Sequence, residues 1–105
     1  MRNDFFRDFV AEQLEGLSEI SIRTMFGGYG IYRAKDFFGI IHKGRLYFKV
    51  SDKTKTSFTD AGMGPFKPSR KQTLKSFYEV PADVLESRST ITDWAEDAIK
   101  SARKT

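Results

Sequence analysis

Two apolar segments separated by Lys43-Gly44 constrain the fold of this chain more than any other feature. The segments run from Phe37 to His42 and from Arg45 to Val50. A two-residue linker that ends in glycine is typical of a tight β-hairpin turn. Because residues directly opposite one another in a hairpin share a face, the turn fixes which side chains lie together.

The predicted register gives the hairpin two unlike faces. The first face is wholly apolar and pairs Ile41 with Leu46, Gly39 with Phe48 and Phe37 with Val50. The second face mixes aromatic and basic side chains and pairs His42 with Arg45, Ile40 with Tyr47 and Phe38 with Lys49. We expect the first face to meet helices and the second to be covered by another element or to bind a partner.

Further strands are predicted on both sides of the hairpin. Residues 20–24 alternate between apolar and polar and lead into residues 27–30, where three glycines in four positions permit a tight turn or bulge. Residues 71–80 are predicted as a strand with Leu74, Tyr78 and Val80 on one face and Lys71, Thr73, Lys75 and Phe77 on the other. The glycine- and proline-rich residues 62–68 are predicted as a rigid connector.

Helices are predicted at both ends of the chain. Residues 3–16 carry apolar side chains at helical spacing, with Asn3 or Asp4 as the N-cap, Gly16 at the end, and Phe5 and Phe9 widening the apolar stripe. Thr90, with Asp93 as capping-box partner, is predicted to begin the final helix. Its apolar stripe comprises Ile91, Trp94, Ala95, Ala98, Ile99 and Ala102. Trp94 and Phe66 are predicted to be core anchors.

The predicted order of elements defines the fold class. A short helix or loop is expected at 52–62, and a short helical turn is expected after Pro81. The whole pattern predicts an α+β fold in two layers, in which the N- and C-terminal helices cover one face of an antiparallel sheet.

The amino-acid composition excludes several classes of protein. The 105 residues contain ten Phe, no Cys and a single His, so thiolate chemistry and His-rich metal sites are excluded. No apolar run approaches the ~20 residues that a membrane-spanning helix needs. Residues 1–10 contain three charged side chains within Asp4–Asp8 and do not resemble a secretory signal. We expect one cytoplasmic domain with no metal, cofactor or membrane contact.

The net charge of +4 is distributed unevenly along the chain. Residues 21–78 contain twelve Lys or Arg and three Asp or Glu, whereas the segments before and after are acidic overall. A strongly basic segment is typical of domains that bind polyanions. The alternative is a basic sheet beside acidic helices, whose fields partly cancel.

The candidate binding surface combines the mixed face of the hairpin with the basic face of the 71–80 strand. Its aromatic members would stack on nucleic-acid bases, and these are Phe38, Tyr47 and Phe77. Its basic members would neutralise phosphates, and these are Arg45, Lys49, Lys71 and Lys75. Aromatic residues and Arg are also enriched at protein interfaces, so a protein-binding surface is the alternative and the one we favour.

No catalytic site is predicted. Phosphate-binding glycine loops precede a helix, whereas strand-like Ile31 and Tyr32 follow the glycine run here, so a structural turn is favoured. His42 has no second residue placed to orient it as a general base, and Arg45 beside it disfavours its protonated form. We therefore expect a surface histidine and no enzymatic activity.

The glycine run also carries a family resemblance. Met25-Phe26-Gly27-Gly28-Tyr29-Gly30 resembles the signature of the TfoX/Sxy family N-terminal domain. Matching pieces follow in order at residues 44–49, 64–66, 77–81 and 94–98. The resemblance implies a two-layer α/β domain similar to secretion-chaperone folds, a stand-alone N-terminal domain over residues 1–105, and a link to the regulation of competence genes. It supplies no catalytic residues.

The predicted function is that of a non-catalytic regulatory or adaptor module. We expect it to act through protein contacts in transcription regulation, either by self-association as a dimer or with the transcription machinery. Direct binding of DNA or RNA through the aromatic–basic face is the alternative.

Overall fold

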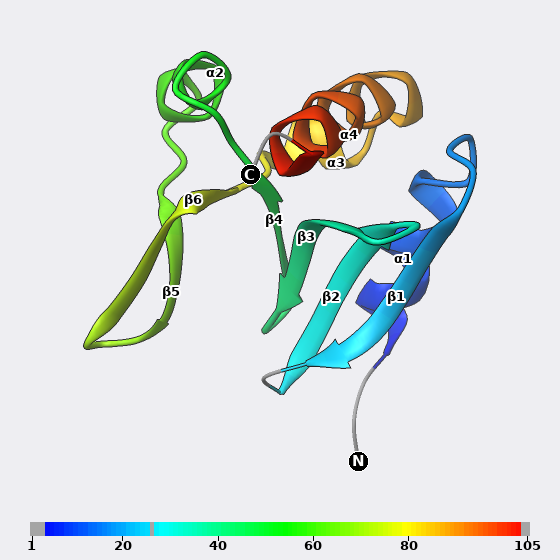
Figure 1. Cartoon of the computed structure of the whole chain (residues 1–105), viewed down its shortest axis with the longest axis horizontal. Helices are drawn as coiled ribbons and strands as arrows, with labels where there is room; N and C mark the ends of the chain where they lie inside the picture. The colour runs from blue at the N-terminus through cyan, green and yellow to red at the C-terminus, as the bar shows by residue number, and fades with distance from the viewer. Residues whose placement is uncertain (1–3, 26, 104–105) are drawn as a thin grey trace.

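A six-stranded antiparallel sheet forms the centre of the molecule, and helices lie at both ends of the chain (Figure 1). The computed structural model describes residues 4–25 and 27–103. The elements are α1 (Phe5–Gln13), β1 (Ile20–Met25), β2 (Gly28–Arg33), β3 (Asp36–His42), β4 (Arg45–Lys49), α2 (Lys55–Asp60), β5 (Pro65–Ser69), β6 (Gln72–Glu79), α3 (Ala82–Leu85) and α4 (Arg88–Arg103). The strand order is β1-β2-β3-β4-β6-β5. The α+β prediction is confirmed, and no helix in the described ranges is long and apolar enough to cross a membrane.

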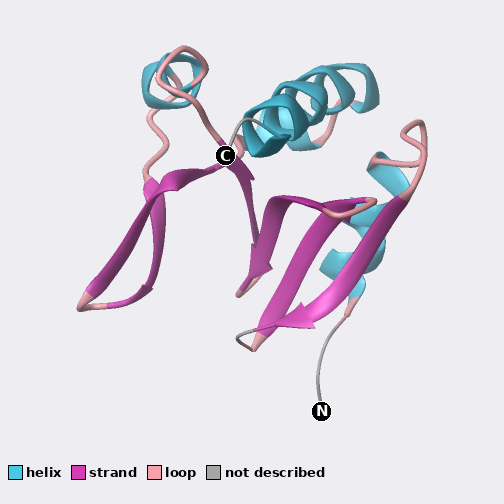
Figure 2. Cartoon of the chain, in the orientation of Figure 1, coloured by secondary structure: helices cyan, strands magenta, loops and turns pink. Residues whose placement is uncertain are grey.

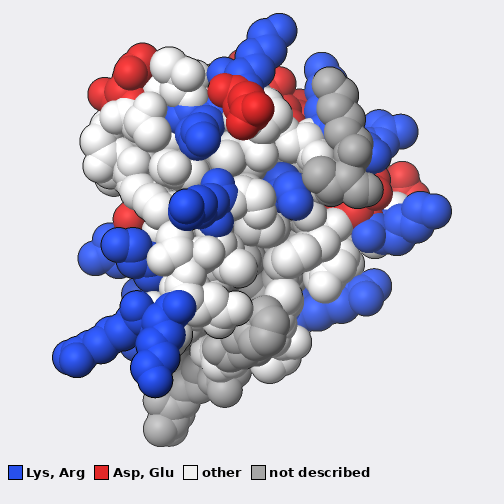
Figure 3. Space-filling model, turned by 60° about the vertical axis from the view of Figure 1, so that its left-hand side comes forward, with Lys and Arg blue, Asp and Glu red and all other residues white. Residues whose placement is uncertain are grey.

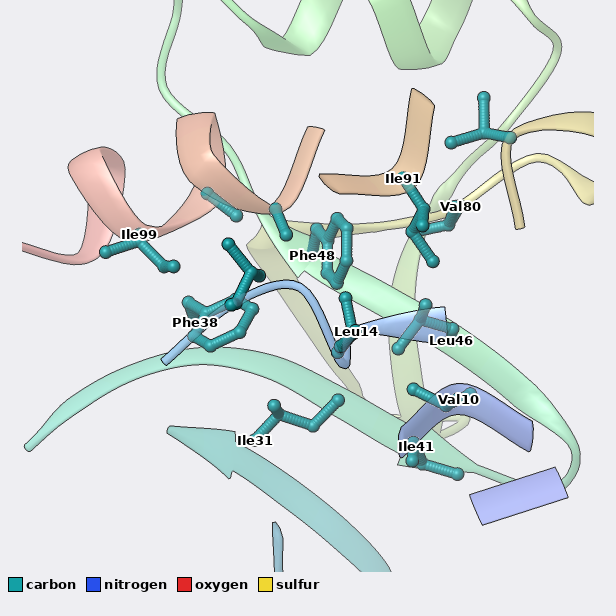
Figure 4. Close-up of a cluster of buried hydrophobic side chains, with 14 of the residues drawn as sticks. Val10, Leu14, Ile31, Phe38, Ile41, Leu46, Phe48, Val80, Ile91 and Ile99 are labelled. Carbon is teal, nitrogen blue, oxygen red and sulfur yellow. The ribbon is translucent and has the colours of Figure 1, made fainter. Parts of the chain in front are cut away.

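The larger core lies between the sheet and the helices (Figure 4). It joins side chains from both terminal helices to those from the sheet, and its fully enclosed members include Val10, Leu14, Ile31, Phe38, Leu46, Phe48 and Ile91. Val10 and Leu14 from the N-terminal segment and Ile91, Ala95 and Ile99 from α4 are buried in this one core. The terminal helices therefore share one face of the sheet, as predicted.

The β3–β4 hairpin turns at Lys43-Gly44 as predicted. Its register pairs His42 with Arg45 and Gly39 with Phe48. Both turn residues have positive φ, 52° for Lys43 and 74° for Gly44, as the two-residue turn of a right-twisted hairpin requires.

The assignment of Phe37 and Phe38 to the two faces of the sheet was wrong. Ile31 lies opposite Gly39 but Tyr32 lies opposite Phe37, so Phe38 is an additional residue in β3. A bulge of this kind moves the preceding side chains to the other face. Phe38 is consequently fully buried against Phe48 on the helix side.

Residues 65–69 form strand β5, so the prediction of a connector over 62–68 was wrong for this part. β5 is an edge strand, where prolines that lack an N–H are tolerated, and both Pro65 and Pro68 lie in it. β6 pairs with β4 only near residues 77–79, and the tip of the β5–β6 hairpin diverges from the rest of the sheet (Figure 2).

Side chains fill the space between this hairpin and β3–β4. Phe66, Tyr47, Phe77 and Ile40 form a second core, with Leu74 packed against it. Leu74 was predicted to share a face with Tyr78 and Val80, but the irregular β5–β6 register places it with Phe77 instead. Phe66 is only 1% exposed and is confirmed as a core anchor.

Helix ends differ from the predicted caps. Ser87 precedes α4, and its Oγ accepts a hydrogen bond from the Thr90 N–H at 3.3 Å, so α4 begins at Arg88 and the Thr90–Asp93 capping box was wrong. At α1, Asn3 lies outside the described residues and the Asp4 side chain does not cap the helix. Trp94 is only partly buried, against Phe58.

Candidate functional site

The predicted aromatic members of the binding surface are buried in the protein itself. Tyr47 is 8% exposed and Phe77 is 4% exposed in the second core, while Phe38 belongs to the first. The ring of Phe66 from β5 lies 4.7 Å from that of Tyr47, centroid to centroid. Stacking of these three rings on bases is therefore blocked. Phe38 lies on the helix side of the sheet, and the predicted alternative, a face covered by another element, holds for Tyr47 and Phe77.

The predicted basic members have unlike surroundings. Nη1 of Arg45 lies 3.1 Å from both carboxylate oxygens of Glu79, which neutralises its charge. Nζ of Lys49 lies over the ring of Phe77, 5.4 Å from its centroid. Lys71 and Lys75 are exposed on the β5–β6 hairpin and form no ion pair with any residue that the structure describes.

A groove beside α1 was not predicted from the sequence. Its volume is about 620 Å³. Helix α1 contributes Phe5, Phe6, Arg7 and Phe9, the sheet contributes residues 27–29 and Ile41, and the β3–β4 turn contributes Lys43-Gly44. Apolar side chains thus line a groove that two cations, Arg7 and Lys43, border.

The glycine signature brings the strands of this groove together. Gly27 has φ 76° in the β1–β2 turn, which confirms the predicted structural turn. A Cβ added to Gly28 would overlap the backbone carbonyl oxygen of Ile41 and lie 3.2 Å from its carbonyl carbon. β2 can approach β3 here only because residue 28 has no side chain. Phe26 of the signature lies outside the described residues.

Tyr29 of the signature fixes the first turn of α1. Its hydroxyl donates a hydrogen bond to the carboxylate of Asp4, and the guanidinium of Arg7 lies 5.4 Å from the centroid of its ring. Arg7 also donates to Asp8 at 2.9 Å, and this hydrogen bond raises the pKa of Arg7. The signature therefore positions both α1 and one of the two cations beside the groove.

Gln13 fixes the other end of α1. It is 7% exposed, and its Nε2 donates to the carbonyl oxygen of Leu85 at 2.9 Å, while its Oε1 accepts from Nε of Arg88 at 3.2 Å. Arg88 also contacts the carboxylates of Glu12 and Glu15. Hydrogen bonds therefore hold both ends of α1 in place beside the groove.

Phe5 is a large apolar side chain of α1 that belongs to neither core. It is 81% exposed at the groove. The neighbouring surface of α1 carries Phe9 with the acidic side chains Asp8, Glu12 and Glu15. Clustered exposed apolar groups rimmed by charge are typical of interaction sites.

His42 has the environment of a structural residue. Its ring contacts Phe66 edge-on, with centroids 5.2 Å apart. Partial burial, and secondly the charge of Lys43, lower the pKa of His42. The sequence had indicated Arg45 as the responsible neighbour, but Arg45 is paired with Glu79. Within residues 4–25 and 27–103, no group of His, Asp and Glu has an arrangement that could hold a metal ion.

The fold and the glycine signature together define a small α+β domain of a single family. The sequence matches the family model of the TfoX N-terminal domain over residues 12–102, and the chain belongs to this family. A relative is the DNA transformation protein TfoX1 of Aliivibrio fischeri (strain ATCC 700601 / ES114), which is 24% identical over 89 residues. The match covers 83% of this chain and 43% of the relative, so the chain spans less than half of that protein's length.

Proposed function

We propose that this domain is a non-catalytic module of a regulator of DNA transformation and that it acts in the cytoplasm by binding a protein partner through the groove beside α1. Membership of the TfoX N-terminal domain family and similarity to a DNA transformation protein support the biological role. Phe5 is 81% exposed at the edge of an aromatic groove, and this exposure supports binding of a protein partner there.

The lining of the groove specifies the chemistry of the partner. Phe5, Phe6 and Phe9 offer apolar contact area, and Lys43 offers positive charge beside it. A segment with an apolar anchor next to an acidic side chain complements both features. Burial of an exposed Phe side chain contributes about 1.5–3 kcal/mol, the size of an interface hot spot.

The two fixed ends of α1 support binding rather than catalysis. A preformed groove avoids the ordering cost that a flexible segment would add to association. Two cations at α1 are engaged in structural pairs, since Arg88 contacts Glu12 and Glu15, and Arg7 contacts Asp8. The transcription machinery is the partner class we infer, with a second copy of the chain as the alternative.

Deletion of the gene that encodes this chain tests the biological role. We expect the deletion to lower the frequency of DNA transformation and the transcript levels of DNA-uptake genes, and a plasmid copy to restore both. An unchanged transformation frequency would overturn the proposal. Light scattering behind a sizing column tests the alternative partner, because a dimer that dissociates in the Phe5→Ser variant would assign the groove to a second copy.

A further inference from the structure

We propose that the β5–β6 hairpin is a contact surface for the phosphate backbone of duplex DNA. The contact groups are Lys67, Arg70, Lys71 and Lys75, which we call the basic hairpin. This surface is separate from the groove beside α1, and the inference stands independently of the proposed protein partner.

The basic hairpin carries uncompensated positive charge. Residues 61–78 contain these four cations and no Asp or Glu. All four are exposed, and within the described part of the chain none of them forms an ion pair, in contrast to Arg7, Arg45, Arg88 and Arg103. Figure 3 turns this side of the molecule forward, and the lower part of the view shows basic but no acidic side chains.

The second core holds the hairpin rigidly. Phe66 lies opposite Leu74 in the ladder, and both pack toward Tyr47 and Phe77. Side chains alternate along a strand, so Lys67 beside Phe66 and Lys75 beside Leu74 lie on the opposite, outward side. Arg70 and Lys71 occupy the turn between the strands. The cations are thus presented on one rigid ribbon.

The shape and chemistry of the ribbon favour duplex DNA. The major groove of B-DNA admits a two-stranded β-ribbon. Exposed Ser69, Gln72 and Thr73 lie between the cations and supply hydrogen-bond donors of the type that contact phosphates.

Other partners fit the ribbon less well. The described hairpin exposes no aromatic ring on which bases of a single strand would stack, because Phe66 and Phe77 are buried. It also lacks an exposed large apolar side chain of the kind that anchors protein interfaces. Contact with the phosphate backbone of a duplex would use both the cations of the basic hairpin and the polar side chains between them.

Salt dependence of binding tests this inference. Fluorescence anisotropy would measure the affinity of the full chain for a fluorescein-labelled mixed-sequence duplex of about 25 base pairs at rising salt. Four phosphate contacts predict a slope of about −3.6 in log affinity against log salt, which is a loss of about 150-fold between about 50 and 200 mM salt. The double variant Lys67→Gln/Lys71→Gln should reduce the slope to about −1.8.

A charge-matched control separates this site from net charge. The double variant Lys35→Gln/Lys100→Gln removes the same charge from exposed positions in the β2–β3 turn and on α4, and it should retain the wild-type slope. Circular dichroism confirms that each variant is folded. Absence of duplex binding at about 50 mM salt, equal slopes for the two double variants, or tighter binding to single-stranded DNA, RNA or poly-glutamate than to the duplex would each overturn the inference.

Discussion

Replacement of Gly28 by alanine tests whether the close approach of two strands requires this glycine of the family signature. Gly28 pairs with Met25 across the β1–β2 turn, and its Cα faces the backbone of Ile41 in β3. An added methyl group would overlap the Ile41 carbonyl oxygen and lie 3.3 Å from Cα of His42. A main-chain obstacle cannot rotate away as a flexible side chain can, so the β2–β3 ladder has to open.

The cost follows from these contacts. Overpacking by one methyl group costs about 1–3 kcal/mol, and each ladder hydrogen bond that is weakened adds about 1 kcal/mol. We therefore expect Gly28→Ala to lower the free energy of unfolding by about 3 kcal/mol or more. Domains of this kind have a total of only about 5–15 kcal/mol, so the variant would lose a large share of its stability.

Two other glycines provide matched controls. Gly16 has no atom within 4 Å of an added Cβ and an ordinary φ, so Gly16→Ala should be neutral or stabilise by up to about 1 kcal/mol. Gly44 also has open space but a φ of 74°, so Gly44→Ala should cost about 1–2 kcal/mol through backbone strain alone.

Urea unfolding followed by the fluorescence of Trp94 measures all three variants, because Trp94 is the single Trp and contacts Phe58 at 4.7 Å between ring centroids. At an m-value of about 1.5 kcal/mol/M, the Gly28→Ala midpoint should fall by about 2 M. A midpoint for Gly28→Ala equal to that of Gly16→Ala would refute the close approach of β2 and β3.

Two further predictions use urea unfolding followed by far-ultraviolet circular dichroism, because Trp94→Ala removes the fluorescence signal. Phe66→Ala should lower the free energy of unfolding by about 3–5 kcal/mol because Phe66 is 1% exposed. Trp94→Ala should lower it by about half as much because Trp94 is only partly buried. Equal losses for the two variants would contradict this difference in burial. The folded-state pKa of His42 is lowered by burial and by Lys43, so its contribution to stability is present above the unfolded pKa of about 6.5 and is lost as pH falls through the folded value. His42→Gln should therefore flatten the decline of the unfolding free energy between about pH 7 and pH 5, and an unchanged decline would contradict the shift.

The β3–β4 hairpin could be predicted from the sequence because neighbouring residues determine its turn. The register of strands that are distant in the sequence could not be predicted in this way. Lys43-Gly44 determines the turn from two adjacent residues. The bulge at Phe38 depends on how β2 pairs with β3, and no neighbouring residue signals it. Pro65 and Pro68 suggest a connector unless the strand is known to lie at an edge, which only the assembled sheet shows.

The candidate site was missed for a related reason. Phe5 and Phe9 were attributed to the apolar stripe of α1, because helical spacing alone does not show how wide a face the sheet covers. Val10 and Leu14 fill that face, and Phe5 remains exposed. The signal in the sequence was a stripe of aromatic residues wider than one buried face needs. The sequence did show that the middle of the chain is basic. Because Tyr47 and Phe77 are buried, the exposed part of this basic segment lies on the β5–β6 hairpin.

The transformation frequency supported by Phe5 variants tests whether the groove beside α1 binds the partner. In a strain deleted for this gene, Phe5→Leu keeps an apolar anchor at the groove and Phe5→Ser removes it. Because Phe5 is 81% exposed, both variants should unfold within about 0.5 kcal/mol of wild type. We expect Phe5→Leu to restore transformation and Phe5→Ser, with an affinity for the partner roughly 10- to 150-fold weaker, to restore little of it. Full restoration by Phe5→Ser at an equal protein level would contradict a role for the groove.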